Sequence, residues 1–183
     1  MRAALLKEAR RAKLQMGKIE LYDLVLTPRY YKMFQYKGPG VQRAPGTISS
    51  LTKKIFGIAS KDWYEPNSKF EAGDTSSFFI QWVGLFKPAL QRGDKFTKAK
   101  IELIIQGSFK KDGSGEFKMK MTPAMFTKFD YSNFFQRMLY EAYNRMFYYE
   151  QRRKYRQYIL MKFDELVSEL KSVFGESLAE VEE

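Results

Sequence analysis

The chain of 183 residues contains no cysteine and no histidine. These absences exclude disulfide bonds, zinc sites built on thiolate or imidazole ligands, and catalysis by Cys–His or Ser–His–Asp groups. No glycine-rich loop for phosphates is present, because Gly113-Ser114-Gly115 falls in an expected hairpin with no helix start behind it. The carboxylates do not have metal-ligand spacing. We therefore expect a protein that is not an enzyme and that carries no metal and no cofactor.

Long apolar runs are missing as well. The longest uncharged stretch, Thr75–Phe86, has twelve residues, which is too short to cross a bilayer as a helix. The N-terminus also lacks the apolar stretch and cleavage site of a signal peptide. Together with the lack of cysteine, these observations predict a cytoplasmic protein without a transmembrane segment.

The sequence is rich in aromatic residues and in positive charge. Hydrophobic residues make up 44% of the chain and aromatic residues 16%, which is enough for a packed core. The net charge is +11, and it is uneven: residues 1–18 hold six Lys and Arg against one Glu, whereas residues 164–183 hold seven acids against one Lys. This asymmetry predicts an anionic macromolecular partner or association of the chain with itself.

The patterns divide the chain into three parts. Residues 1–17 form an expected basic amphipathic helix, in which Leu5 and Met16 share an apolar stripe and Arg10 and Arg11 lie on the other side. Residues 18–163 form a single expected α+β domain. Residues 164–183 form an expected acidic end of a C-terminal helix, followed by a tail.

The predicted fold class is α+β, an antiparallel β-sheet packed by a long C-terminal α-helix. A first strand over 18–26 is followed by Thr27-Pro28, which predicts the start of a short helix over 29–37. A second short helix is expected from Thr47. Alternating apolar residues then predict strands over 63–71, 77–86, 98–105 and 117–121, with a hairpin loop over 110–115.

The strand over 77–86 differs from its neighbours because both of its faces are apolar. Phe78 and Trp82 point to one face, and Phe79 and Val83 point to the other. We expect the long helix to cover one face and the N-terminal helix or a second subunit to cover the other. A homo-oligomer formed through this strand and the long helix is therefore one hypothesis.

The long helix is expected over 132–174, because neither proline nor glycine interrupts it. At 1.5 Å per residue it would measure roughly 64 Å, so it must project beyond a compact domain of about 30–35 Å or break. Its first apolar stripe, from Phe135 to Tyr149, is expected to pack on the sheet. Its second stripe, from Tyr155 to Val173, is expected to pack on another element or another chain. The two stripes change register at Arg152-Arg153-Lys154.

Basic and aromatic residues alternate around this change of register, as in proteins that bind single-stranded nucleic acid. The candidate residues for binding an anionic partner (RNA, a ribonucleoprotein or an acidic protein surface) are Arg10, Arg11, Arg145, Tyr148, Tyr149, Arg152, Arg153, Lys154, Tyr155 and Arg156. The alternative interpretation is that the tyrosines are core and boundary residues and that the cations form an ordinary solvated face. A non-enzymatic binding or scaffold protein is the leading functional hypothesis.

The order of elements, together with Asp62-Trp63-Tyr64-Glu65-Pro66 after the short helices, resembles the helix-grip architecture of the START-like superfamily over roughly residues 18–163. The resemblance implies a curved sheet that grips the C-terminal helix around an apolar cavity. The implied lining residues are Trp82, Ile101, Leu103, Met119, Met121 and Met146. A carrier of an apolar small molecule is therefore the second hypothesis, and a self-assembling structural protein is the third. The N-terminal helix and the overlong final helix depart from the family pattern.

Overall fold

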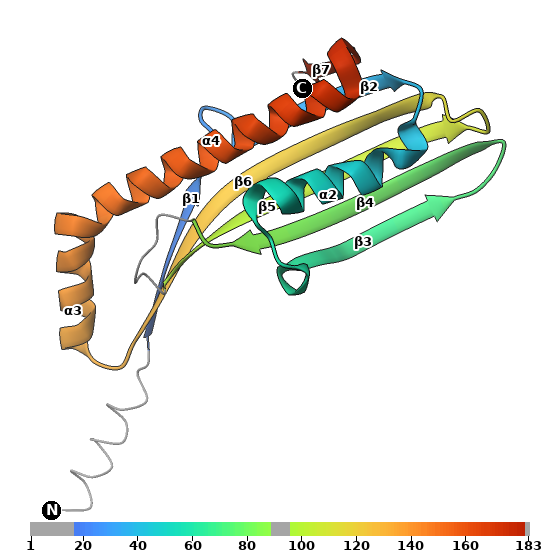
Figure 1. Ribbon diagram of the computed structural model, residues 1–183. Coiled ribbons are helices and arrows are strands. Elements are labelled where there is room, and N and C mark those ends of the chain that lie inside the picture. The colour runs from blue at the N-terminus through green and yellow to red at the C-terminus, as the bar shows by residue number, and fades with distance from the viewer. Residues whose placement is uncertain (1–16, 89–95, 182–183) are drawn as a thin grey trace, which may run out of the picture.

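The computed structural model describes residues 17–88 and 96–181 (Figure 1). In chain order, the elements are β1 (Gly17–Leu24), β2 (Lys32–Gly38), the 3-10 turn η1 (Val41–Arg43), α2 (Ala44–Phe56), the 3-10 turn η2 (Ser60–Asp62), β3 (Trp63–Glu71), β4 (Thr75–Phe86), β5 (Thr97–Lys110), β6 (Gly115–Tyr131), α3 (Phe134–Tyr143), the π-helical turn η3 (Asn144–Tyr148), α4 (Tyr149–Phe174), the 3-10 turn η4 (Gly175–Ser177) and β7 (Leu178–Val181). The expected N-terminal helix falls on residues outside these ranges, except that Gly17 begins β1.

One antiparallel sheet organises the molecule, and its longest strand is β6. Along one edge of β6 runs β5, with Thr97 opposite Thr127 and Phe109 opposite Gly115. Along the other edge lie β2, beside the first part of β6, and β1, beside the last part. The sheet order is β3-β4-β5-β6-β2-β7, with β1 paired to β6 off this path. The predicted α+β class with a long C-terminal helix on an antiparallel sheet is confirmed.

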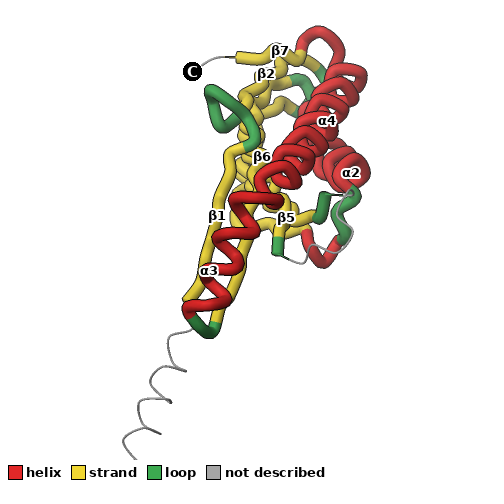
Figure 2. The backbone as a smooth tube through the Cα atoms, turned by 90° about the vertical axis from the view of Figure 1, so that its left-hand side faces the viewer, coloured by secondary structure: helices red, strands yellow, loops and turns green. Residues whose placement is uncertain are grey.

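The core lies between one face of this sheet and the helices α4 and α2, which run side by side across it (Figures 1 and 2). Alternate residues of each strand point into this layer, as the period-2 pattern predicts. From β5 these are Ala99, Ile101, Leu103 and Ile105. From α4 they are Tyr155, Ile159, Phe163, Leu166 and Leu170, at steps of four and three that keep one helical face against the sheet.

The opposite face of the sheet has no helix over it within residues 17–88 and 96–181 (Figure 2). The two-faced strand predicted over 77–86 is β4. Phe78 and Trp82 are buried in the core, whereas Phe79 and Val83 are half-buried on the open face. This first face is covered by the helical layer, but the helix that packs on β4 is α2 rather than the expected long helix.

The prediction of a short helix over 29–37 is wrong, because most of this stretch belongs to strand β2, Lys32–Gly38. Phe34 and Tyr36 point into the core, while Gln35 between them and Lys37 point outward. The alternation of apolar and polar residues therefore determines the structure here. Pro28 lies in the turn between β1 and β2, where its peptide bond with Thr27 is cis. The second expected helix is α2, which begins at Ala44 and is preceded by η1.

The long C-terminal helix does not run straight, and two predictions about it are wrong. The helical segment changes direction at η3, upstream of the expected change at 152–154 (Figure 1). The expected roles of the two stripes are reversed as well, since α4 packs on the sheet and Phe135, Met146 and Tyr149 of the first stripe are exposed. The acidic end of the helix is found where it was expected, since α4 continues to Phe174, but part of the expected tail forms β7, which pairs with β2.

Candidate functional site

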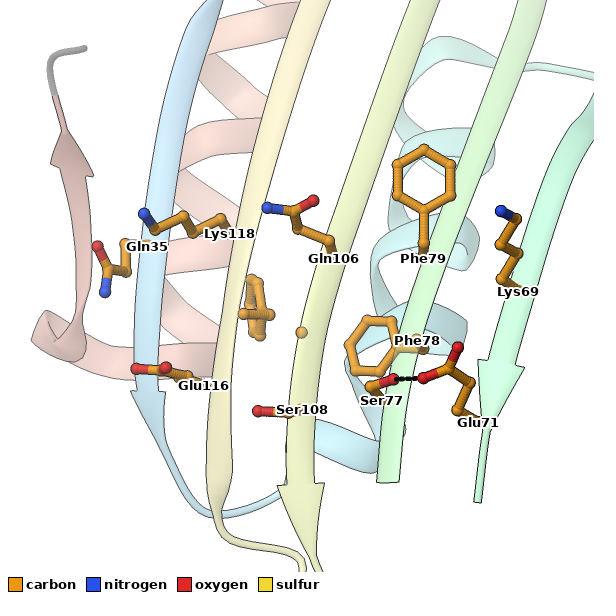
Figure 3. A pocket seen from close by; sticks show the side chains of 12 residues that line it. Gln35, Lys69, Glu71, Ser77, Phe78, Phe79, Gln106, Ser108, Glu116 and Lys118 are labelled. Atoms are coloured by element: carbon orange, nitrogen blue, oxygen red, sulfur yellow. Dashed lines mark hydrogen bonds between the residues drawn. The ribbon is translucent and has the colours of Figure 1, made fainter. Parts of the chain in front are cut away.

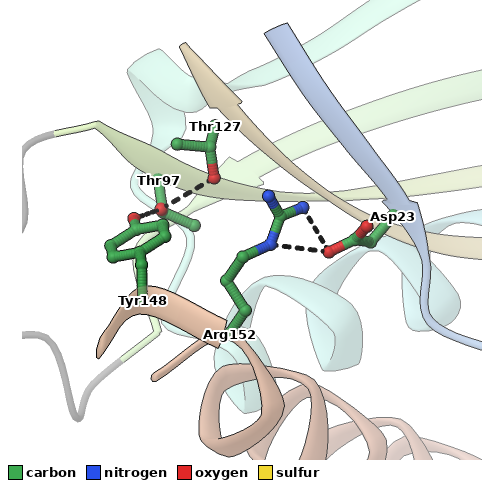
Figure 4. Close-up of polar contacts among 5 residues, drawn as sticks. All are labelled: Asp23, Thr97, Thr127, Tyr148 and Arg152. Atoms are coloured by element: carbon green, nitrogen blue, oxygen red, sulfur yellow. Dashed lines mark hydrogen bonds and ion pairs between the residues drawn. The ribbon is translucent and has the colours of Figure 1, made fainter. Parts of the chain in front are cut away.

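The change of helix direction is fixed by an ion pair between α4 and β1. The Arg152 Nε donates a hydrogen bond to Asp23 Oδ2 at 2.8 Å, and a second guanidinium nitrogen bonds to the same oxygen (Figure 4). The Arg152 side chain is only 10% exposed, whereas that of Asp23 is 42% exposed. Arg152 therefore joins the start of α4 to β1, and it is not available to a partner.

A second contact ties the π-helical turn to the sheet. The hydroxyl of Tyr148 is hydrogen-bonded to that of Thr97, whose oxygen lies 3.0 Å from the hydroxyl of Thr127 on the neighbouring strand (Figure 4). All three residues are buried. Buried hydroxyls need such partners, because an unpaired one costs free energy. This cluster explains why Tyr148 points inward.

The next turn of α4 is anchored to the segment after β1. The Arg156 Nε donates to the Val25 carbonyl oxygen at 2.9 Å, and the Arg156 Nη2 donates to Thr27 Oγ1 at 2.7 Å. Tyr155 beside it is buried in the core. Four of the predicted partner-binding residues, Tyr148, Arg152, Tyr155 and Arg156, are therefore engaged within the fold.

The remaining candidates divide into two groups. Arg145, Tyr149, Arg153 and Lys154 are exposed where η3 meets α4, and we call them the corner surface. Among the described part of the chain, no salt bridge involves its three cations. Arg10 and Arg11 lie outside the described residues, in the N-terminal segment that leads into β1.

The helix α3 turns an apolar face away from the sheet. It touches β6 through Tyr140, whose ring stacks on that of Phe129 at a centroid distance of 4.1 Å and an interplanar angle of 9°. Residues two positions before and after Tyr140 lie on the opposite side of the helix. These are Met138 and Ala142, and both are exposed. The α3 apolar face consists of Phe134, Phe135, Met138 and Ala142.

The exposure of this face is large for such bulky side chains. Phe134 is 74% exposed and Phe135 66%. Leu139, Tyr143 and Met146 beside the face are also more than half exposed. Isolated apolar residues on a surface are normal, but a contiguous group of them marks an interaction site. The sequence analysis identified part of this stripe and assigned it to the core.

The polar side of α3 carries little net charge. The Arg137 Nε donates to Glu141 Oε1 at 2.9 Å, one helical turn further on, and this hydrogen bond raises the pKa of Arg137. The helix begins at Asn133, whose side-chain oxygen accepts from the Gln136 backbone N–H at 2.8 Å. The positive charge near α3 comes from the corner surface.

An aromatic hollow of about 530 Å³ lies between α3, η3 and the end of β6. Its lining is predominantly aromatic and apolar: Phe96, Phe129, Asp130, Gln136, Leu139, Tyr140, Tyr143 and Tyr148. The sequence analysis did not predict this hollow. Tyr140 and Tyr148, eight residues apart, were the available signal, because both tyrosines are buried and line the hollow.

The apolar cavity implied by the helix-grip resemblance is not formed at its expected lining. Ile101, Leu103, Met119 and Met121 have 0% exposed surface, so no void large enough for water adjoins them. Trp82 is buried with them, and its indole N–H donates to Glu65 Oε2 at 3.0 Å. The sixth residue, Met146, is 72% exposed on η3, away from this group.

A second hollow, of about 400 Å³, lies on the open face of the sheet (Figure 3). Lysine and glutamate side chains alternate around it, namely Lys69, Glu71, Glu116 and Lys118. Glu71 accepts a hydrogen bond from Ser77 Oγ at 3.2 Å. The opposite charges balance, and the described residues include no cluster of three or more His, Cys, Asp or Glu side chains that could hold a metal ion. This hollow therefore lacks the charge bias of the corner surface.

Comparisons with known proteins add little. No family model matches the chain, and a search of curated proteins finds no match. A solved structure of a protein of unknown function from Staphylococcus aureus is similar over 90% of this chain and 98% of its own, at 8% identity and a TM-score of 0.23. A TM-score this low carries no argument. The antiparallel sheet with a C-terminal helix is compatible with a helix-grip-like fold.

Proposed function

We propose that this protein is a non-enzymatic binding protein that engages an anionic partner through the corner surface and the basic N-terminal segment containing Arg10 and Arg11. The observation that supports the proposal is the exposure of three clustered cations on the corner surface. Arg145, Arg153 and Lys154 are exposed and clustered, while Arg152 and Arg156 beside them hold the fold together. Within the described part of the chain, no salt bridge engages Arg145, Arg153 or Lys154.

The geometry narrows the set of residues that serves this function. Tyr149 and Arg153 are four residues apart on α4, so their side chains lie on the same face. Glu150 is the only acid between Arg145 and Lys154, which leaves the corner with a net charge of about +2 when the exposed residues alone are counted. An anionic partner would release counterions on binding, so affinity is expected to fall steeply as salt is raised.

The test is a charge reversal with a matched control. The triple variant Arg145→Glu, Arg153→Glu and Lys154→Glu should lose most of its retention on immobilised heparin, a generic polyanion. The control triple variant Lys54→Glu, Lys61→Glu and Lys69→Glu changes exposed lysines elsewhere by the same total charge. Equal losses in the two variants would mean that only net charge matters, and the proposal would be wrong.

The other two hypotheses have less support. A carrier of an apolar small molecule needs a cavity under the C-terminal helix, but four of the six expected lining residues, Ile101, Leu103, Met119 and Met121, have no exposed surface. Membership of the START-like superfamily therefore stays a prediction, as does a cytoplasmic location. The hypothesis of a self-assembling protein is supported by the α3 apolar face, which a second copy of the chain would cover. The oligomeric state of the protein tests this hypothesis.

A further inference from the structure

The α3 apolar face and the corner surface are consecutive along one helical segment. The face runs from Phe134 to Ala142, and the cations run from Arg145 to Lys154. Within residues 17–88 and 96–181, no helix is long and apolar enough to cross a bilayer. At ten residues, α3 is about 15 Å long, roughly half the thickness of the hydrocarbon layer. α3 is therefore too short to cross a bilayer, and a partner contacts it along its exposed apolar face.

The basic N-terminal segment leaves the domain at the same end. Gly17, the first residue of β1, pairs with Tyr131, three residues before the start of α3 (Figure 2). Residues 1–16 hold five Lys and Arg and a single Glu. One end of the molecule thus brings together an apolar helical face, the exposed cations of the corner surface, and the attachment point of a further basic segment.

We propose that this end of the molecule docks on the surface of an anionic lipid bilayer. The α3 apolar face enters the boundary between headgroups and acyl chains, and Arg145, Arg153 and Lys154 contact the headgroup phosphates. Amphipathic helices that lie in the membrane plane combine apolar and basic surfaces in this way. The inference rests on the proposed function, because it assigns a partner to the same cations.

The chemistry of the exposed face favours lipid over nucleic acid. Met138 and Leu139 are aliphatic, so they offer no ring on which a base could stack, yet they lie beside the two phenylalanines. Acyl chains, by contrast, accept aliphatic and aromatic side chains alike. Tyr149 is exposed at the start of α4, and tyrosine is enriched at the headgroup level because its ring is apolar and its hydroxyl is polar.

Charge favours an anionic bilayer over a second copy of this chain. If two α3 faces met, the positively charged corner surfaces would come close to one another, and like charges at an interface are unfavourable. Anionic headgroups reverse the sign of this interaction. Each Lys or Arg near such a surface favours binding by about fivefold to sixfold, from about 1 kcal/mol per charge.

The experiment measures cosedimentation of the full chain with large unilamellar vesicles. One set contains phosphatidylcholine alone, and the other contains phosphatidylcholine and phosphatidylglycerol. We expect binding to the anionic vesicles to be stronger, and to fall by on the order of 100-fold in the variant Phe134→Ser, Phe135→Ser, Met138→Ser. The control Tyr22→Ser, Tyr64→Ser, Phe70→Ser removes exposed rings elsewhere and should bind like the parent protein. Unfolding midpoints show whether each variant is folded.

The outcomes separate this inference from the proposed function. Salt-sensitive binding to heparin without binding to anionic vesicles would overturn the lipid inference and leave the proposed function standing. Binding to neither would overturn both. Sedimentation of a dimer that the α3 variant abolishes, without vesicle binding, would assign the face to a second copy and overturn the inference. Equal losses in the α3 and control variants would also contradict it.

Discussion

The two helical parts of the C-terminal segment, α3 and α4, use similar residues for opposite purposes. Both helices are amphipathic and place phenylalanine on their apolar face, Phe134 and Phe135 in α3 and Phe163 in α4. In α4 this face is fully buried, and Phe163 has no exposed surface. In α3 it is turned away from the sheet, and Phe135 is 66% exposed. An amphipathic pattern therefore shows that a helix has an apolar side, but not what covers that side.

The difference originates in the η3 turn. A π-helical turn closes its hydrogen bonds over five residues instead of four, so it shifts the angular positions of the residues that follow. Tyr148 at the end of η3 is held inward by Thr97, and Arg152 one turn later is held by Asp23. These contacts set the face that α4 presents to the sheet. The face that α3 turns toward the sheet is set separately, by the stacking of Tyr140 on Phe129.

The largest expected effect compares the same substitution in the two helices. Phe163→Ala should lower the free energy of unfolding by about 3–5 kcal/mol, because it leaves a cavity in the core. Phe135→Ala should change it by less than about 0.5 kcal/mol, because that ring is already in solvent. Urea denaturation of both variants measures the difference. A loss of stability in Phe135→Ala as large as that in Phe163→Ala would show that the α3 face is covered within the molecule.

A smaller effect separates the structural arginines from the exposed ones. Arg152→Ala removes both hydrogen bonds to Asp23, so unfolding should become easier by about 1–3 kcal/mol. The lower end of this range is expected if the half-exposed Asp23 carboxylate turns to water. Arg153→Ala, one residue along, should be nearly neutral for stability. It should instead weaken heparin binding, because Arg153 is exposed on the corner surface. Arg152→Ala should weaken heparin binding only through a change in the structure where η3 meets α4. Equal stability in the two variants would contradict the assignment.

The sequence predicted well whatever depends on local alternation. The strands β3 to β6, the β5–β6 hairpin and the inward side of β4 follow from period-2 patterns that a single strand carries by itself. The helical stretch was also recognised, since neither proline nor glycine interrupts it. For β2, the chemistry of Thr27-Pro28 favoured a helix start, although the alternation of Phe34 and Tyr36 with their polar neighbours was visible.

The candidate site was harder to predict, because its residues are sorted by contacts between distant parts of the chain. Arg152 meets Asp23 across 129 residues, and Tyr148 meets Thr97 across 51. Nothing adjacent to Arg152 or Arg153 in the sequence shows that the first is buried and the second exposed. The same reason explains why the roles of the two apolar stripes were interchanged.

A still smaller effect tests the hydroxyl that anchors η3. Tyr148→Phe keeps the ring in place and removes one hydrogen bond, while Thr97 keeps its contact with Thr127. We expect a loss of about 0.5–1.5 kcal/mol in the free energy of unfolding. The matched variant Tyr149→Phe changes an exposed ring on the next residue and should have no measurable effect. If both variants behaved alike, η3 would not be anchored through Tyr148.

The smallest expected effect concerns surface ion pairs, where the two helices should behave alike. Glu141 accepts a hydrogen bond from Arg137 on α3, and Glu165 accepts one from Lys162 on α4. Each bond raises the pKa of its cation, so the stabilisation is complete at neutral pH and is lost only when the pH rises, far above neutrality, through the raised pKa of Arg137 or Lys162. Because the pairs are largely solvated and screened by salt, Glu141→Gln and Glu165→Gln should each leave the urea midpoint at neutral pH unchanged within error. A clear shift for Glu165→Gln alone would mean that charge contributes to the packing of α4, and burial of apolar side chains would then not be the sole difference between the helices.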